Sequence, residues 1–189
     1  MGLKFVTNAA GRKVPNIING MKAVPYKGVG KFTPKGVKAA PPVRSCQDYP
    51  SSGNKVARSL KEALQKCGLN NGMTISSHHH FRNGDLIMNQ VFDTAAEMGV
   101  KNLRWFPSAA FPCHEPMIGH MEKGVIHHIE GSLNGPLGNY ASEGKMNGLA
   151  VLRSHGGRWQ AIQDGEVHID IAIIAAPTSD PFGNATGDR

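Results

Sequence analysis

From about residue 51 onward, hydrophobic residues recur alternately at helical and at strand spacing. Helices are expected over residues 56–67, after the capping residues Ser51, Ser52 and Asn54, and over 85–98, 116–123 and 138–145. Strands are expected over residues 73–77, 102–106, 125–130, 149–153 and 167–175. Strands that alternate with helices imply crossover connections, so the pattern predicts an α/β fold with a mostly parallel sheet and helices on both faces.

The last of these strands has the highest apolar density. The run Ile169-Asp-Ile-Ala-Ile-Ile-Ala-Ala176 is almost continuously apolar, with Asp170 as its one charged residue. Strands buried on both faces show such runs, so this segment is expected to be a central strand.

The first 45 residues differ from the rest of the chain. They carry nine Lys or Arg residues and no Asp or Glu, and five prolines interrupt them. The pattern is aperiodic, so residues 1–50 are expected to form a basic, Pro/Gly-rich arm and residues 51–189 the α/β domain. The arm's aromatic residues are too sparse for a nucleic-acid stacking platform, and no nucleic-acid partner is expected.

Composition excludes several classes. Hydrophobic residues make up 40% of the 189 residues, too many for a disordered chain. No apolar run reaches the about 20 residues that a membrane helix needs, so no membrane partner is expected. Cys46, Cys67 and Cys113 form neither a disulfide framework nor a Cys-x-x-Cys pair, which favours a reducing, cytoplasmic location.

The densest group of candidate site residues lies where the strand 73–77 gives way to the next helix. It comprises His78, His79, His80, Arg82 and Gly84. In open α/β sheets ligands lie at the carboxyl ends of strands, facing helix N-termini that favour anions. This segment therefore predicts a site for a small, negatively charged molecule.

Two further segments follow expected strands and supply the remaining candidates. These are His155, Gly156, Gly157 and Arg158 in one segment, and Asp180, Gly183 and Asn184 in the other. The first is expected to be a ligand-binding turn or, as an alternative, a β-hairpin tip with Gly156-Gly157 at its apex. Because parallel strands end at one edge, all three segments are expected to converge on one crevice.

Other chemistries have weaker sequence support. The nine histidines raise the alternative of a metal-dependent hydrolase, but His114-Glu-Pro-Met-Ile118 lacks the second histidine of a zinc helix, and no metal is expected. The chain contains no Gly-x-Ser-x-Gly elbow, Rossmann glycine motif or P-loop.

The segment Asp170-Ile-Ala-Ile-Ile-Ala-Ala, followed by Ser179-Asp180-Pro-Phe-Gly183-Asn184, resembles the coenzyme A transferases. Further motifs occur in the order found in the citrate lyase alpha-subunit family of that superfamily. They are Gly72–Leu86, Cys113-His-Glu-Pro116, Gly135-Pro-Leu137, Ser154-His-Gly-Gly-Arg158 and Ala175-Ala-Pro-Thr-Ser179. The resemblance covers roughly residues 50–187.

The resemblance implies a citrate transferase. In that family citrate replaces the acetyl group on the phosphopantetheine-type thioester of a carrier protein or of coenzyme A, and a beta subunit then cleaves the citryl thioester to oxaloacetate. It implies beta and acyl carrier subunits as partners and no cofactor bound by this chain. Arg82 and Arg158 are the expected anion contacts, because a fork of donors matches a carboxylate bidentately.

The resemblance also implies that the chain is an N-terminal fragment, an incomplete half of a two-domain subunit, inactive without its C-terminal half. The catalytic residue therefore stays unassigned. A non-catalytic binding or assembly module with the same fold is the alternative.

Overall fold

The computed structural model describes residues 4–7, 11, 13–18, 20–22, 54–78 and 81–186. The chain divides into two compact units, Met1–Gly36 and Val37–Arg189. In the first unit, β1 (Phe5–Thr7) pairs antiparallel with β2 (Lys13–Pro15), and β3 (Ile17–Ile18) pairs with β4 (Met21–Lys22). The aperiodic sequence did not predict these two short hairpins. The division into an arm over 1–50 and a domain over 51–189 stays a prediction.

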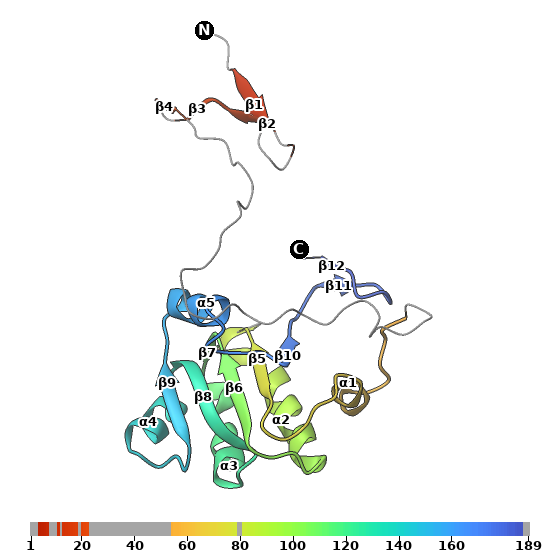
Figure 1. The fold of residues 1–189 in the computed structure, drawn as a ribbon, viewed down its shortest axis with the longest axis vertical. Helices are drawn as coiled ribbons and strands as arrows, with labels where there is room; N and C mark the ends of the chain where they lie inside the picture. The colour runs from red at the N-terminus through yellow and green to blue at the C-terminus, as the bar shows by residue number, and fades with distance from the viewer. Residues whose placement is uncertain are drawn as a thin grey trace. The chain divides into compact units, whose positions relative to one another are not determined.

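The second unit is an α/β domain (Figure 1). Its helices are α1 (Leu60–Lys66), α2 (Ile87–Glu97), α3 (Met117–Glu122), α4 (Pro136–Ser142) and α5 (His155–Gln163), with short 3-10 turns η2 (Arg82–Gly84) and η3 (Pro112–His114). Its strands are β5 (Thr74–Ser77), β6 (Leu103–Pro107), β7 (Ala109–Ala110), β8 (Ile126–Leu133), β9 (Leu149–Leu152), β10 (Ile171–Ile173), β11 (Thr178–Ser179) and β12 (Ala185–Thr186).

Six of these strands form one parallel sheet. Its order is β10-β5-β6-β8, and β8 also pairs with β7 and β9. The mostly parallel α/β fold is thus confirmed, and nearly every expected helix and strand is present within a few residues of its expected bounds.

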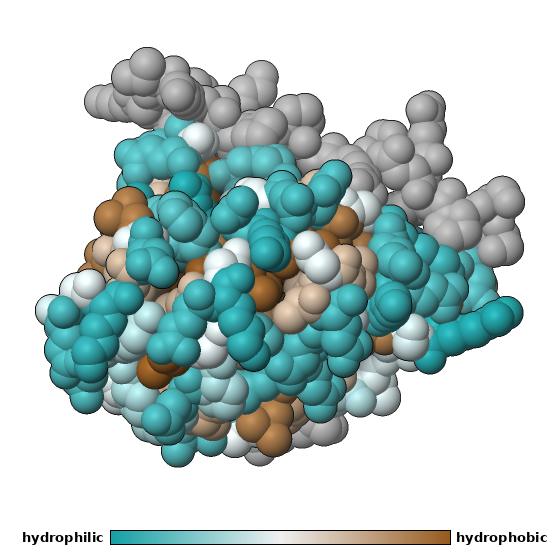
Figure 2. Space-filling model, turned by 90° about the horizontal axis from the view of Figure 1, so that it is seen from below, coloured by the Kyte–Doolittle hydropathy of each residue, from teal (hydrophilic) through white to brown (hydrophobic). Residues whose placement is uncertain are grey.

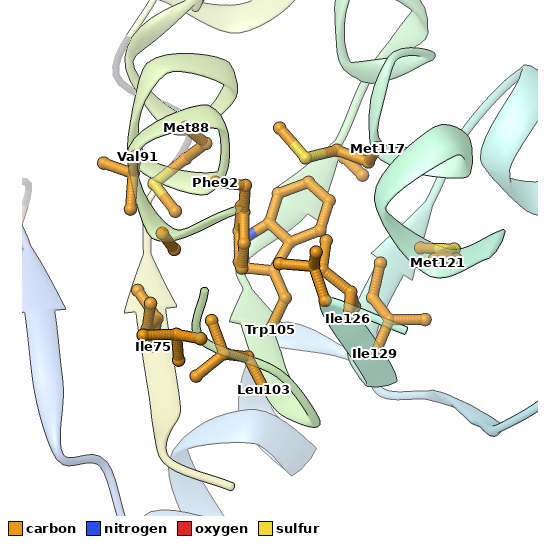
Figure 3. Close-up of a cluster of buried hydrophobic side chains, with 14 of the residues drawn as sticks. Ile75, Met88, Val91, Phe92, Leu103, Trp105, Met117, Met121, Ile126 and Ile129 are labelled. Atoms are coloured by element: carbon orange, nitrogen blue, oxygen red, sulfur yellow. The ribbon is translucent and has the colours of Figure 1, made fainter. Parts of the chain in front are cut away.

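The main core lies on the face covered by α1 to α4. Side chains of α2 and α3 and of the strands meet around Trp105, as Figure 3 shows. Trp105 is fully buried, and its indole N–H donates to Ser77 Oγ at 3.0 Å. A smaller cluster on the opposite face joins Phe106 of β6 to Ala161 of α5 and to Val167. Because Trp105 and Phe106 are consecutive on one strand, the two clusters lie on opposite faces of the sheet.

The expectation of a central strand over 169–175 is wrong. In the described sheet β10 lies at an edge and pairs with β5, while β6 and β8 are central. Ile171 faces the main core and is 5% exposed, whereas Ala172, on the other face of β10, is exposed, and Ile174 just after the strand is 81% exposed. A run of apolar residues shows that both faces of a strand are apolar, but it does not show that both faces are buried. In β10 one face is exposed.

The first expected helix begins later than its caps suggested. Ser59 is the N-cap of α1, and its Oγ accepts a hydrogen bond from the Glu62 N–H at 3.1 Å. Asn54 instead accepts from the Val56 N–H at 2.9 Å in a local turn, and Val56 is exposed. Ser51 and Ser52 lie outside the described residues.

The surface seen from below, on the side where α3 lies in Figure 1, is mostly hydrophilic (Figure 2). Its hydrophobic residues form scattered small patches rather than one continuous area. Small scattered patches are normal for globular proteins.

Candidate functional site

The turn after β5 has a defined geometry. His78 is exposed, His79 and His80 lie outside the described residues, and Arg82 begins η2 with an exposed side chain. Arg82 has a left-handed backbone with φ of 53°, which is rare for a residue with a side chain. Asp85 is fully buried, and its Oδ1 accepts from the Ile87 N–H at 3.0 Å where α2 begins. A buried carboxylate therefore fixes the helix start, and Arg82 is left on the surface.

The segment 154–158 is neither a turn nor a hairpin tip, as was expected, but the beginning of α5. Ser154 is the N-cap, and its Oγ accepts from the Gly157 N–H at 3.0 Å. Gly156 and Gly157 therefore lie in the first helical turn. Two adjacent glycines disfavour a helix, whereas the Ser154 side chain stabilises its first turn.

Arg158 of α5 is held at the carboxyl ends of β5 and β6. Its Nη2 donates to Ser76 Oγ at 2.6 Å, to the Phe106 carbonyl at 3.2 Å and to the Ser77 carbonyl at 3.5 Å. The guanidinium also lies 4.7 Å from the centre of the Phe106 ring. Burial lowers the pKa of Arg158 from its usual value. Arg158 thus joins α5 to the sheet as well as placing a cation at the strand ends.

The Asp180 loop connects β11 to β12. Asp180 Oδ1 accepts from the N–H groups of Phe182 and Asn184, each at 2.9 Å, and Oδ2 accepts from Asn184 Nδ2 at 2.8 Å. These bonds, led by the one from the Asn184 side chain, lower the pKa of the Asp180 carboxyl. The loop is exposed, and its carboxylate is used to hold Asn184 and the loop backbone.

The topology brings the starts of these segments to one edge of the sheet. Arg82 follows β5, Arg158 contacts the end of β5, and the chain that leads to Asp180 leaves β10, which is parallel to β5. Their convergence on one crevice stays a prediction. A concave region of about 440 Å³ lies elsewhere, between α4 and β9, and none of the described candidate residues lines it.

The family model of the citrate lyase alpha subunit matches residues 53–189. The chain belongs to this family.

Individual relatives agree with the family match. The citrate lyase alpha chain of Escherichia coli (strain K12) is 42% identical over 147 residues, which cover 77% of this chain and 29% of the relative. That of Klebsiella pneumoniae is 46% identical over 134 residues, covering 70% of this chain and 26% of the relative. The family resemblance inferred from the ordered motifs is thus confirmed.

A solved structure shares the fold. A structure described as a citrate lyase alpha subunit in complex with citrate, from Streptococcus mutans, has a TM-score of 0.71 and 40% identity. The match covers 87% of this chain and 32% of that chain. The chain therefore spans about three tenths of the length of its citrate lyase relatives.

A buried ionic network, absent from the sequence interpretation, lies on the α5 face of this citrate lyase family fold. Glu130 of β8 is 3% exposed and accepts from Arg153 Nε and, at 3.1 Å, from His128 Nε2. Arg153 Nη2 also contacts Glu166 at 3.2 Å. Hydrogen bonding to Glu130 raises the pKa of Arg153, whereas burial and then Arg104 lower the pKa of His128. The network ties β8 to the end of β9 and to the chain after α5.

The histidines do not gather into a chelating group in the described residues. Among residues 54–78 and 81–186, no three His, Cys, Asp or Glu side chains are grouped so that they could hold a metal ion. Over the same residues, no helix is both long and apolar enough to cross a bilayer.

Proposed function

We propose that this chain supplies the citrate-binding part of a citrate lyase alpha subunit. In the proposed reaction citrate takes the place of the acetyl group on a thioester, so that a citryl thioester and acetate are formed. The observation that carries the proposal is that Arg158 is held at the carboxyl end of β5, the strand that the turn with the exposed Arg82 follows in the chain. A related structure, from Streptococcus mutans, is described as a complex with citrate, which supports the choice of citrate as the anion.

Citrate matches this arrangement chemically. A tricarboxylate is recognised by forked guanidinium groups, which bind a carboxylate through two parallel hydrogen bonds. Arg82 is the exposed member of the pair, whereas Nη2 of Arg158 is already engaged by three protein acceptors. We therefore expect Arg82 to make the more extensive contact with citrate.

Backbone donors supply the other requirement, the stabilisation of an oxyanion during thioester exchange. The N–H groups of Gly84 and Gly183 donate within their own turns, and that of Gly157 donates to Ser154 Oγ. Gly156, in the first turn of α5, lies where helical N–H groups have no acceptor within the helix. We therefore assign the oxyanion contact to the Gly156 N–H. We assign no catalytic residue in this chain.

The proposed partners follow from the family. The thioester would be carried by the phosphopantetheine-type group of an acyl carrier subunit or by coenzyme A, and the citryl product would pass to a beta subunit. Cys113 is a free thiol, which supports a reducing, cytoplasmic compartment.

Calorimetric titration of citrate into the chain tests the proposal without requiring turnover. We expect saturable binding that Arg82→Ala weakens by about 10- to 100-fold, the effect of losing a hydrogen bond between charged groups. Lys123→Ala is the matched control, because it removes one exposed positive charge at the end of α3, away from the strand ends. Equal binding by the Arg82→Ala variant and the parent would contradict the proposal.

A further inference from the structure

Cys113 of η3 contacts the Arg82–Gly84 turn through its backbone and its side chain. Its N–H donates to Asn83 Oδ1 at 3.0 Å, and its thiol donates to the Asp85 carbonyl at 3.4 Å and lies 3.7 Å from the Arg82 carbonyl. The Cys113 carbonyl accepts from Asn89 Nδ2 of α2 at 3.0 Å. One residue therefore links η3 to both ends of the turn and to the following helix.

The turn needs such support because Arg82 adopts the left-handed backbone conformation. For a residue with a β-carbon this conformation is unfavourable, and it persists only where neighbouring groups hold it. Besides the thiol, the Arg82 carbonyl accepts the Asp85 N–H at 3.2 Å. The thiol thus contacts the two carbonyls that bound the strained turn.

The surroundings of the thiol suit a hydrogen-bond donor rather than a nucleophile. Burial raises the pKa of Cys113, so the sulfur keeps its proton at neutral pH. His114 Nδ1 is 3.8 Å from the sulfur, but it already accepts the Phe111 N–H at 3.0 Å. The neighbouring imidazole therefore has no free lone pair on that nitrogen with which to remove the thiol proton.

We propose that Cys113 is a positioning residue that, together with Asn83, holds the backbone of Arg82 so that its guanidinium meets a carboxylate of the substrate. The inference rests on the proposed function, because it takes Arg82 to be a citrate contact. It gives a role to the Cys113-His-Glu-Pro116 motif, which the proposed citrate contacts do not use.

A double-mutant cycle on citrate affinity in the 189-residue chain tests this role. We expect Cys113→Ala to weaken citrate binding by about 3- to 10-fold, the effect of losing hydrogen bonds that act indirectly. Arg82→Ala should weaken it more, and the double variant should bind no more weakly than Arg82→Ala alone. That non-additivity would show that Cys113 acts through Arg82, which a role in stability alone would not produce.

Two further variants sharpen the result. Asn83→Ala removes the other support of the turn and should show the same non-additivity with Arg82→Ala, and Cys67→Ala, at an exposed thiol, should leave affinity unchanged. If Arg82→Ala weakens binding while Cys113→Ala and Asn83→Ala do not, the positioning role is wrong and the proposed function stands. If the parent chain binds no citrate, both are overturned.

Discussion

The two faces of the parallel sheet are stabilised in different ways. The face under α1 to α4 buries a large, almost wholly apolar cluster centred on Trp105. On the α5 face a small apolar cluster around Phe106 lies among polar strand residues, which include Ser76 and Glu130. The first face accounts for most of the apolar burial, and the second holds the ionic and hydrogen-bonded groups near the candidate site.

This difference has a physical consequence. Apolar contacts are non-directional and tolerate small adjustments, whereas a guanidinium bound to two carbonyls and a hydroxyl is fixed in direction. The α5 face can therefore orient groups at the strand ends, such as Arg158, while the opposite face stabilises the sheet that carries them. The predictions below test this division, starting with the largest expected effect.

The largest effect is expected at β10, where a buried isoleucine in the strand can be compared with an exposed isoleucine just after it. Ile171→Asp places a charge in the main core and should lower the free energy of unfolding by about 3–5 kcal/mol. Ile174→Asp, at the exposed position just after the strand, should change it by no more than about 0.5 kcal/mol. Urea denaturation measures the free energy of unfolding of both variants, and similar losses would show that Ile174 is as buried as Ile171.

An intermediate effect is expected from the ionic network. Glu130→Ala should cost about 2–3 kcal/mol, because it leaves the partly buried Arg153 and His128 without their shared carboxylate. Glu166→Ala removes the exposed partner of the same arginine and should cost less than about 1 kcal/mol. Thermal denaturation measures the loss of stability in each variant. Equal losses in the two variants would mean that Glu130 is not the buried centre of the network.

The smallest effect is expected from pH. Burial lowers the pKa of His114 on the core face and of His128 on the α5 face below their usual value of 6.5. The unfolded chain then takes up protons near pH 6.5 while the folded chain does not, so stability is lost as the pH falls below that value.

Urea midpoints measured between pH 7.5 and pH 5 should therefore fall with pH. The fall should be smaller in His114→Asn, since an amide oxygen can accept the Phe111 N–H without titrating. A midpoint that is constant or rises as the pH falls would exclude the buried neutral imidazoles as its cause.

The sequence predicted those elements whose signals are local. The strand at 73–77 and the helix after Asp85 combine periodic apolar residues with a carboxylate that can accept the first helical N–H groups, and both are present. The α5 helix was missed because Gly156-Gly157 obscured the Ser154 cap.

Interactions between distant parts of the chain gave no sequence signal. The sequence indicated Arg158 as an anion contact, but its contact with Ser76 spans 82 positions. The contact of Cys113 with Asn83 spans 30 positions. Periodicity describes one segment at a time, so neither contact could be inferred without the packing of α5 and η3.

The chain has two tryptophans, one on each face of the sheet. The fluorescence of the two faces can therefore be distinguished. Trp105 is fully buried in the main core, whereas Trp159 on α5 is 56% exposed. Their emission should therefore separate into a short-wavelength component shielded from quenchers and a long-wavelength component open to them. Because the Trp105 indole donates to Ser77 Oγ and the Ser77 carbonyl accepts from Arg158, the shielded fluorophore is only one residue away from the candidate site. The protein thus carries an intrinsic reporter of how firmly the strand ends are held.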